Sequence, residues 1–476
     1  MTIRRLQFTE WKPDQPAIGD SLNDAKNVVP VLAGYAPFPS ASNFSNAASE
    51  NLNSVFVGKI GDTIQLFGGG LTKLFKFDST NLNMTDVSKG GGYGGTTRWT
   101  FTQFGDVVIG ANNHEKLQAW TVGVSTAFAD LAAAAPVAKY VTVVRDFVVA
   151  ANLTAGSDPN KVQWSNINDE TNWTSGSASQ SDYQIIADGG NITGLSGGEF
   201  GLILLERAIY RMSYIGSPLF FQFDAISRNL GCIEGGSVAQ YGGTTYFLSD
   251  DGFYSCDGKQ ITPIGAEKVD KYFFNTFDIK KSDTMSATVD PIRKLVLWNY
   301  PTVAGGRAII IYNWQLNKWS RLETEVDYVG SVSTVGTSLE GIGALYSSIE
   351  TVPASFDDRI WAGGKFVLGG VDGGKIISFT GTNLTANIIL SDIEDGYNSV
   401  VTLARPLVDN GAGDVSVASR RTLSDNITFG TAVSAGEGGR CSLRSAGRWH
   451  RFSITPTGNW TTAIGLDVET TPQGTR

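Results

Sequence analysis

Short apolar segments recur along the chain from about residue 54 to about residue 314, and polar turns separate them. In each repeat, an apolar segment leads through a tight turn into a second apolar segment, and a third segment rich in Tyr, Phe or Trp follows. β-Branched and aromatic residues favour strands, whereas Gly, Asp and Asn favour the turns between them. The pattern therefore predicts an all-β chain.

The turns at the tips of the first hairpins reveal a period. Consecutive tips lie roughly 40 to 53 residues apart, which is the spacing of four-stranded propeller blades rather than of helical pairs. A seventh, degenerate copy is predicted between Tyr328 and Phe379, with Arg359-Ile-Trp-Ala and Lys375-Ile-Ile-Ser-Phe as its best strands. We therefore predict a β-propeller of six or seven blades. The six clear tips are Gly61-Asp62, Gly105-Asp106, Arg145-Asp146, Gly198-Glu199, Gly242-Gly243 and Ile292-Arg293.

Two regions lie outside the repeats. Residues 1–50 are rich in Pro, Asn and Ser, so we expect an extended N-terminal arm that is ordered by packing on the body or on a neighbouring subunit. Residues 51–380 form the predicted propeller-like body. In residues 381–476 the segments alternate between apolar and polar positions, which is typical of a sandwich with one solvated face per sheet. This predicts a separate, C-terminal β-sandwich-like domain.

Helices are expected to be few. The chain has 56 Gly and only 17% charged residues, whereas helical surfaces need many Ala, Glu and Lys. The best candidates are Ser125–Ala138, which is rich in Ala, and Ala266–Asn275, where Val269, Tyr272 and Phe273 have helical spacing.

The cysteines and the apolar runs indicate the cellular compartment in which the chain folds. The cysteines Cys232, Cys256 and Cys441 have no metal-type spacing, so we expect buried free thiols. No apolar run approaches the ~20 residues that cross a bilayer. The first residues lack the apolar core of a signal peptide. The sequence thus predicts no membrane-spanning segment and folding in the cytoplasm.

Candidate chemistry is scarce. Gly90–Gly95 formally fits a dinucleotide-binding fingerprint, but it leads into a strand at Trp99 instead of a helix. His114 follows two Asn residues in a turn, and His450 lies in an alternating strand, so neither indicates a catalytic triad. We therefore expect no enzyme activity, no cofactor and no metal site.

Four stretches, in order along residues 1–275, carry a family resemblance. The first comprises Trp11-Lys-Pro-Asp-Gln-Pro, Ala25-Lys-Asn-Val-Val-Pro and Gly34-Tyr-Ala-Pro-Phe-Pro. The second is Val162–Trp173, with its V-x-W-S…D…W pattern. The third joins Gly189–Leu195 with Ala208–Gly216, and the fourth is Gly231–Gly265. Together they resemble the tail hub or nozzle proteins of short-tailed bacteriophages (podophages), including the packaged-DNA stabilisation proteins of the P22 type. The residues that carry the motifs are Trp11, Pro13, Asp14, Pro16, Tyr35, Phe38, Trp164, Ser165, Asp169 and Trp173.

The resemblance implies a structural protein of the virion tail that is assembled in the host cytoplasm. In that family, six copies form a ring below the portal and its head–tail adaptor protein and extend the DNA channel. The ring carries a tail fibre, spike or needle protein, and it helps to retain the packaged DNA until ejection. The implied partners are therefore further copies of the chain, the adaptor, a fibre, spike or needle protein, and genomic DNA that passes without specific binding.

The charge of the chain agrees with passive contact with DNA. There are 46 acidic and 37 basic residues, which give a net charge of −9. High-affinity nucleic-acid surfaces need clustered Lys and Arg, which argues against such a surface here. A neutral or acidic wall would instead repel phosphates and let DNA pass.

A receptor- or glycan-binding tail protein is the alternative hypothesis. Propellers can bind sugars through exposed aromatic rings. Most of the candidate rings occur within apolar segments, which favours a place in the blade core. These rings are Trp120, Trp173, Trp298, Trp314, Trp319 and Trp361.

Overall fold

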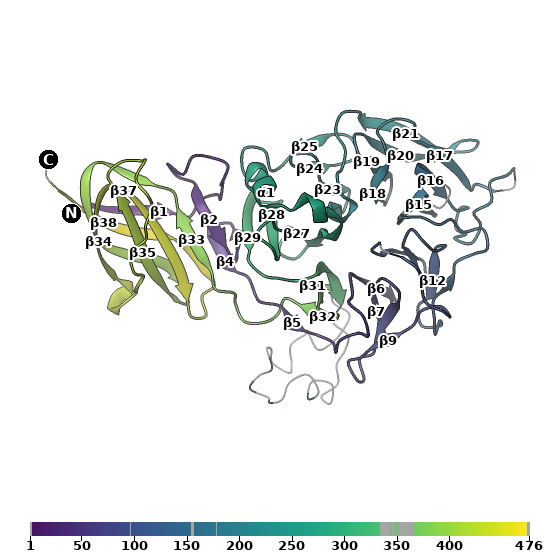
Figure 1. The fold of residues 1–476 in the computed structure, drawn as a ribbon, viewed down its shortest axis with the longest axis horizontal. Coiled ribbons are helices and arrows are strands. Elements are labelled where there is room, and N and C mark those ends of the chain that lie inside the picture. Colours follow the sequence, from purple (N-terminus) through teal and green to yellow (C-terminus); the bar gives the residue numbers. More distant parts are fainter. Residues whose placement is uncertain are drawn as a thin grey trace.

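The computed structural model describes residues 2–95, 97–153, 157–177, 179–333 and 366–473, together with residues 343, 348, 350 and 352. Four-stranded sheets are arranged in a ring, and a second β lobe carries both chain ends (Figure 1). The all-β fold class predicted from the repeats is confirmed.

Seven units share one antiparallel strand order, and six of them are separate four-stranded sheets. The seventh lies at one end of a 14-stranded sheet and consists of β26 (Ser286–Asp290), β27 (Leu295–Pro301), β28 (Arg307–Asn313) and β29 (Lys318–Leu322). The separate blades are β6 (Ser54–Ile60), β7 (Thr63–Gly69), β8 (Leu74–Phe77) and β9 (Met84–Asp86); β10 (Thr100–Phe104), β11 (Val107–Ala111), β12 (Gln118–Thr121) and β13 (Ala129–Asp130); β14 (Tyr140–Val144), β15 (Phe147–Leu153), β16 (Asp158–Trp164) and β17 (Asp182–Ile185); β18 (Ile192–Ser196), β19 (Gly201–Leu205), β20 (Ile209–Gly216) and β21 (Phe220–Ser227); β22 (Ala239–Tyr241), β23 (Thr244–Leu248), β24 (Phe253–Cys256) and β25 (Ile261–Pro263); and β30 (Tyr328–Ser333), β31 (Phe366–Asp372) and β32 (Lys375–Ser378) with β5 (Ser42–Asn43).

The first hairpin of each repeat forms where the turn residues predicted it. Gly61, Gly105, Arg145 and Gly242 each begin a two-residue turn with a positive φ of 54°, 59°, 52° and 60°, respectively. Glycine has no Cβ and adopts such angles at little cost, whereas Arg145 is in a region that L-residues rarely occupy. The local turn chemistry therefore sets the register of these hairpins.

Packing between blades explains the continuous apolar runs. Every residue of β15 is buried, because both faces of the blade are covered by its neighbours. Val148 belongs to a hydrophobic cluster with Ile109 of the preceding blade. Val149, on the opposite face, belongs to a cluster with Ile203 of the following blade. The ring is therefore held together by apolar layers between successive sheets.

The ring is closed by a strand from the N-terminal segment. β5 pairs with β32 as the outermost strand of the last blade, and β30 of that blade lies against β6 of the first one. The predicted seventh copy between Tyr328 and Phe379 thus contributes three strands, and its fourth comes from the start of the chain. Residues 359–362, expected to form one of its strands, lie outside the described residues.

The N-terminal segment runs extended over its own chain. β1 (Thr2–Gln7) pairs with the last strand, β38 (Thr462–Pro472), and β2 (Leu22–Lys26) pairs with both β29 and β33 (Asn387–Leu390). β3 (Val28–Val31) and β4 (Gly34–Pro37) form a hairpin beside them. β2 therefore joins the outer edge of a propeller blade to the C-terminal sheet.

The C-terminal domain is built on two long strands. β34 (Ile393–Asp409) and β37 (Cys441–Thr457) pair with each other, and each has a further partner along another part of its length. β34 pairs with β38, whereas β37 pairs with β33 and with β35 (Ala412–Arg420), which also pairs with the short β36 (Val433–Ser434). Alternate side chains such as Val401, Val415 and Phe452 enter one shared core.

Helices are short, and one helix prediction is wrong. Residues 125–138 form bends, turns and the outer strand β13, because this segment pairs with β12 and places Leu131 and Ala135 in an interblade cluster. The predicted helix near Ala266–Asn275 is present as α1 (Asp270–Thr276). Among residues 179–333 and 366–473, the 3₁₀ turns are η2 (Gly235–Ser237), η3 (Ile279–Thr284) and η5 (Glu437–Gly439). Within the described ranges, no helix has the length and apolar character needed to cross a membrane.

The three cysteines are buried and free, as the sequence predicts. Burial raises the pKa of the Cys232 thiol to about 11. This thiol therefore stays protonated and unreactive at neutral pH.

Candidate functional site

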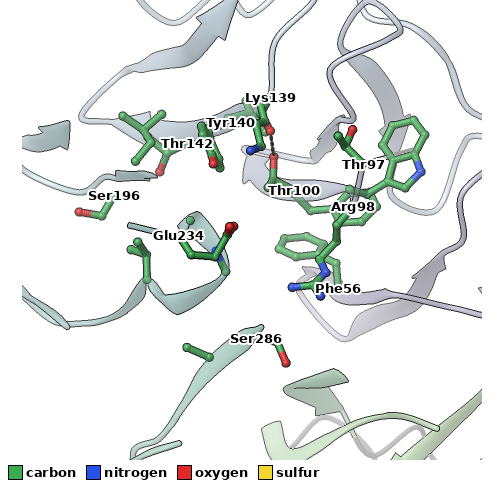
Figure 2. Close-up of a pocket in the computed structure, with 18 of the residues that line it drawn as sticks. Phe56, Thr97, Arg98, Thr100, Lys139, Tyr140, Thr142, Ser196, Glu234 and Ser286 are labelled. Carbon is green, nitrogen blue, oxygen red and sulfur yellow. Dashed lines mark hydrogen bonds between the residues drawn. The ribbon is translucent and has the colours of Figure 1, made fainter. Parts of the chain in front are cut away.

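A cavity of about 350 Å³ lies at the centre of the ring, where the first strands of the blades converge (Figure 2). Each of β6, β10, β14, β18, β22, β26 and β30 contributes lining residues. Further lining residues come from η2, from η3 and from the segment just before β10. The volume falls within the range of small-molecule sites, which is roughly 300–1,000 Å³. The cavity is therefore the candidate functional site.

Arg98 crosses this cavity between distant blades. It precedes β10, and its guanidinium donates hydrogen bonds to the carbonyls of Met285 and Thr284, the latter at 2.9 Å. The guanidinium also lies over the ring of Tyr328, 5.0 Å from the ring centroid. Burial lowers the pKa of Arg98, and nearby tyrosines and carboxylates only partly oppose this effect. The side chain is thus a cation that the protein holds in a poorly solvated place.

Glu234 faces the same cavity from the start of η2. Its carboxylate accepts a hydrogen bond from the backbone N–H of Gly236 at 3.3 Å. Burial raises the pKa of Glu234, whereas the charges of Lys139 and Arg98 act in the opposite direction. The carboxylate is therefore less stable as an anion here than in water.

Two glycines allow the close packing around Glu234. A Cβ at Gly235 would lie 2.4 Å from the hydroxyl oxygen of Tyr140, and a Cβ at Gly236 would lie 2.0 Å from the carbonyl oxygen of Met285. Any larger residue would push η2 away from these groups. The Glu234-Gly-Gly sequence is thus needed for the shape of the cavity wall.

The motif residues of the N-terminal segment lie away from this cavity. Trp11 is 1% exposed, donates from its indole N–H to the carbonyl of Asn23 at 3.2 Å, and contacts the ring of Tyr272 edge-on. The Asp14 carboxylate accepts the backbone N–H groups of Lys271 and Tyr272 at 2.8 and 2.7 Å. Asp14 therefore caps α1 from a distant part of the chain, where the helix has no side-chain cap of its own. Pro13 and Pro16 flank it in the same turn-rich loop.

Tyr35 and Phe38 are fully buried by the same chain. Tyr35 donates its hydroxyl to the carbonyl of Thr9 at 3.0 Å, and Phe38 packs edge-on against Phe379. These rings were expected to anchor the arm on the body or on a neighbouring subunit. In the structure, the body of the same chain buries them, so they are not exposed for contact with another copy.

The second motif joins two interblade cores. Trp164 lies in the cluster on one side of its blade, and Trp173 lies in the cluster on the other side. The Ser165 hydroxyl accepts the N–H of Val148 at 3.0 Å, and the Asp169 carboxylate accepts the N–H and hydroxyl of Thr171. These residues shape the blade; they do not line the central cavity.

Sequence reasoning missed the cavity residues. Arg98 and Lys139 belong to none of the family-like stretches, and Glu234 lies in the fourth one, Gly231–Gly265, but is not among its predicted motif residues. Their position in the repeats could have identified them, because Arg98 and Lys139 lie next to the first strands of the second and third repeats. In a propeller those strands surround the central axis.

The tryptophans considered for glycan binding lie mostly in the core. Trp120, Trp173, Trp298 and Trp319 are each at most 3% exposed. Trp314 is half-buried and packs against the rings of Tyr241 and Tyr246, whereas Trp361 lies outside the described residues. The four buried rings cannot stack on a sugar without unfolding a blade.

Comparisons with known proteins add little beyond the fold. No family model and no curated protein matches the sequence. Among solved structures, the chain is similar to BamB from Moraxella catarrhalis, with 11% identity, a TM-score of 0.32 and coverage of 59% of this chain and 75% of that one. It is also similar to YCF48 bound to D1 peptide, with 9% identity, a TM-score of 0.39 and coverage of 75% and 99%. The propeller assignment itself rests on the strand order described above.

Proposed function

We propose that this chain is a tail hub or nozzle protein of a short-tailed bacteriophage. In this role it extends the DNA channel below the portal and adaptor, helps to retain the packaged genome and lets it pass during ejection. The observation that carries the proposal is the order of the four stretches within residues 1–275 that resemble this family. Four separate matches in one order are harder to produce by chance than one short motif.

The placement of these stretches supports a structural role. The first stretch caps α1 and enters the 14-stranded sheet, and the second packs into the cores on both sides of its blade. The third and fourth stretches, Gly189–Leu195 with Ala208–Gly216 and Gly231–Gly265, include most strands of the next two blades. The segments that resemble the family are thus the ones that build the fold, as expected of a structural protein.

The proposed role also agrees with the electrostatics. A net charge of −9 disfavours tight binding to duplex DNA. We expect the purified chain to bind duplex DNA weakly at moderate salt and to show no nuclease, glycosidase or peptidase activity.

Particles assembled without this chain test the proposal. They should package a genome and then lose it, because the channel lacks its lower part. Nuclease-protected DNA per particle, measured immediately after packaging and again after storage, gives the readout. Particles that keep their DNA and fail only to adsorb to cells would instead favour the receptor-binding alternative.

A further inference from the structure

Four charged side chains of the central cavity carry the inference. Arg98 and Lys139 are basic, Glu234 and Asp283 are acidic, and all four line the same cavity of about 350 Å³. Across the described part of the chain, none of the four forms an ion pair within 4.0 Å. Burial leaves Arg98 and Glu234 in a poorly solvated part of the cavity, where opposite charges attract each other strongly, whereas Asp283 is exposed. The separation of Arg98 from Glu234 therefore requires that other contacts hold each charge in place.

Those contacts involve backbone and aromatic groups. Carbonyls of Thr284 and Met285 hold the Arg98 guanidinium. The Lys139 ammonium lies over the ring of Tyr140, 5.3 Å from its centroid. The Glu234 carboxylate accepts only one long hydrogen bond, from Gly236. Arg98, Lys139 and Glu234 thus each keep bonding capacity that the described residues do not use.

Nearby polar atoms are also incompletely bonded. The Nε of Arg98 and the hydroxyl of Tyr140 are buried and have no hydrogen-bond partner among the described residues. Buried polar atoms are almost always bonded, so each exception calls for an explanation, such as a functional role or a bound water molecule or ion. Burial destabilises the charged forms of both Arg98 and Glu234. Complementary charges placed in the cavity would relieve both effects.

We propose that the cavity binds a zwitterionic ligand, with a carboxylate facing Arg98 and Lys139 and an ammonium group facing Glu234 and Asp283. The lining is electrically balanced, with two cations and two anions, so a ligand carrying one charge of either sign would leave two wall charges unmatched. A free amino acid and a polypeptide loop with neighbouring acidic and basic side chains offer the same chemistry. The experiment below separates these two sources.

Titration of the full-length chain at low ionic strength tests the proposal. The probes are the ω-amino acids glycine, γ-aminobutyrate and 6-aminohexanoate, which place the two charges at increasing separation. Butyrate and butylammonium serve as controls with a single charge. A capped peptide, acetyl-Gly-Lys-Gly-Glu-Gly-amide, represents the polypeptide source. Binding is followed by isothermal titration calorimetry and by the shift in melting temperature.

We expect one ω-amino acid or the peptide to bind at least about tenfold more tightly than either singly charged control. The substitutions Lys139→Gln and Glu234→Gln should each weaken that binding about tenfold, which corresponds to roughly 1.4 kcal/mol. Glutamine at position 234 can still accept the hydrogen bond of Gly236. Glu199→Gln is the matched control, because that side chain is 88% exposed and does not line the cavity. It should leave binding unchanged.

The binding results distinguish the two ligand sources from each other and from a cavity that binds neither. Binding of an ω-amino acid alone identifies a small zwitterion, and binding of the peptide alone identifies a polypeptide segment. If no probe binds at about 10 mM, which corresponds to a binding free energy weaker than about 2.7 kcal/mol, the proposal is wrong. It is equally wrong if Lys139→Gln and Glu234→Gln, folded as judged by melting temperature, bind as well as the wild type.

Discussion

Asp270 illustrates how a single carboxylate responds to its packing. It begins α1 and accepts the N–H of Phe253 at 3.1 Å. A Cβ at Gly252 or Gly265 would lie 2.2 or 2.0 Å from its carboxylate oxygens, so the two glycines enclose it. Burial, with smaller contributions from the charges of Asp14 and Asp251, raises the pKa of Asp270 to about 7.

This shift predicts a dependence of stability on pH. The folded state binds the Asp270 proton more tightly than the unfolded state, whose pKa is near 3.8. The stabilisation from this proton is therefore complete below about pH 4 and decreases as pH rises to about 7. Relative to Asp270→Asn, the wild type should lose melting temperature as pH rises from about 4 to about 7. Equal pH profiles of the two proteins would contradict the burial of this carboxylate.

His450 should act in the opposite direction. Its ring nitrogens form hydrogen bonds of 2.7 Å with the hydroxyls of Ser399 and Ser419, and Ser399 donates to the carboxylate of Asp395. Ser399 has one proton to give, so its oxygen accepts from Nε2 of His450, and Nδ1 accepts from Ser419. Burial lowers the pKa of His450 below 6.5, although Asp395 opposes this effect.

The neutral form of His450 is therefore the one that the fold favours. Stability from this residue is complete above about pH 6.5 and is lost as pH falls through the lower pKa of the folded state. His450→Gln should remove this acid sensitivity, whereas the exposed His114→Gln should leave it unchanged. Thermal unfolding from about pH 7 to pH 5 measures the difference.

Strand β2 is the element that couples the two lobes. Beside it, Arg321 of β29 donates two hydrogen bonds of 2.7 Å to the Asp24 carboxylate. Arg321 also contacts Glu323, whose side chain is 52% exposed. The Asp24 contact is the more buried of the two, because the side chains of Arg321 and Asp24 are 18% and 15% exposed.

Asp24→Ala should therefore destabilise the protein far more than Glu323→Ala. Removing Asp24 leaves a largely buried guanidinium without its main partner, which costs about 3 kcal/mol. Loss of the exposed Glu323 contact should cost less than about 1 kcal/mol. Chemical denaturation of both variants provides the comparison. Similar losses would show that β2 is not fixed through Asp24.

The second strands of the blades set the stability of the ring. Val148 is fully buried in β15 between two sheets. Val148→Asp would place an unpaired charge there at a cost of several kcal/mol, comparable to the stability of a whole domain. It should prevent folding. Tyr183→Asp, on the exposed outer strand β17 of the same blade, should give folded protein at normal yield. Folded Val148→Asp protein would count against the blade assignment.

The sequence predicts well the elements whose partner strands are adjacent along the chain. The tips at Gly61, Gly105 and Gly242 predict their hairpins because turn and flanking strands are contiguous. The insertion of β2 beside β29 and the closure by β5 depend on partners about 300 residues away, so no local pattern indicates them. The segment 125–138 misleads for the same reason. Its Ala content favours a helix, but pairing with β12 determines its conformation.

The sequence alone predicts little of the candidate site. The motif residues Trp11 and Trp164 are each buried in a hydrophobic cluster away from the cavity. By contrast, the cavity gathers Arg98, Glu234 and Asp283 from segments that are far apart in the sequence. Only the closed ring brings these groups together.

At the scale of the whole molecule, the ring and the C-terminal lobe share one sheet. The 14-stranded sheet runs from the blade of β26–β29 through β2 into the C-terminal domain (Figure 1). Backbone hydrogen bonds therefore connect the lobes, in addition to the core that they share. Such a connection would suit the proposed hub role, in which the subunit keeps its shape while DNA passes.

The most direct test of the proposed hub is an image of the assembled particle by cryo-electron microscopy. If the chain is a tail hub, the image should show six copies in a ring directly below the adaptor, with the propeller and the C-terminal lobe in one fixed relative orientation. Density for the chain only at the tips of fibres, away from the DNA channel, would contradict it.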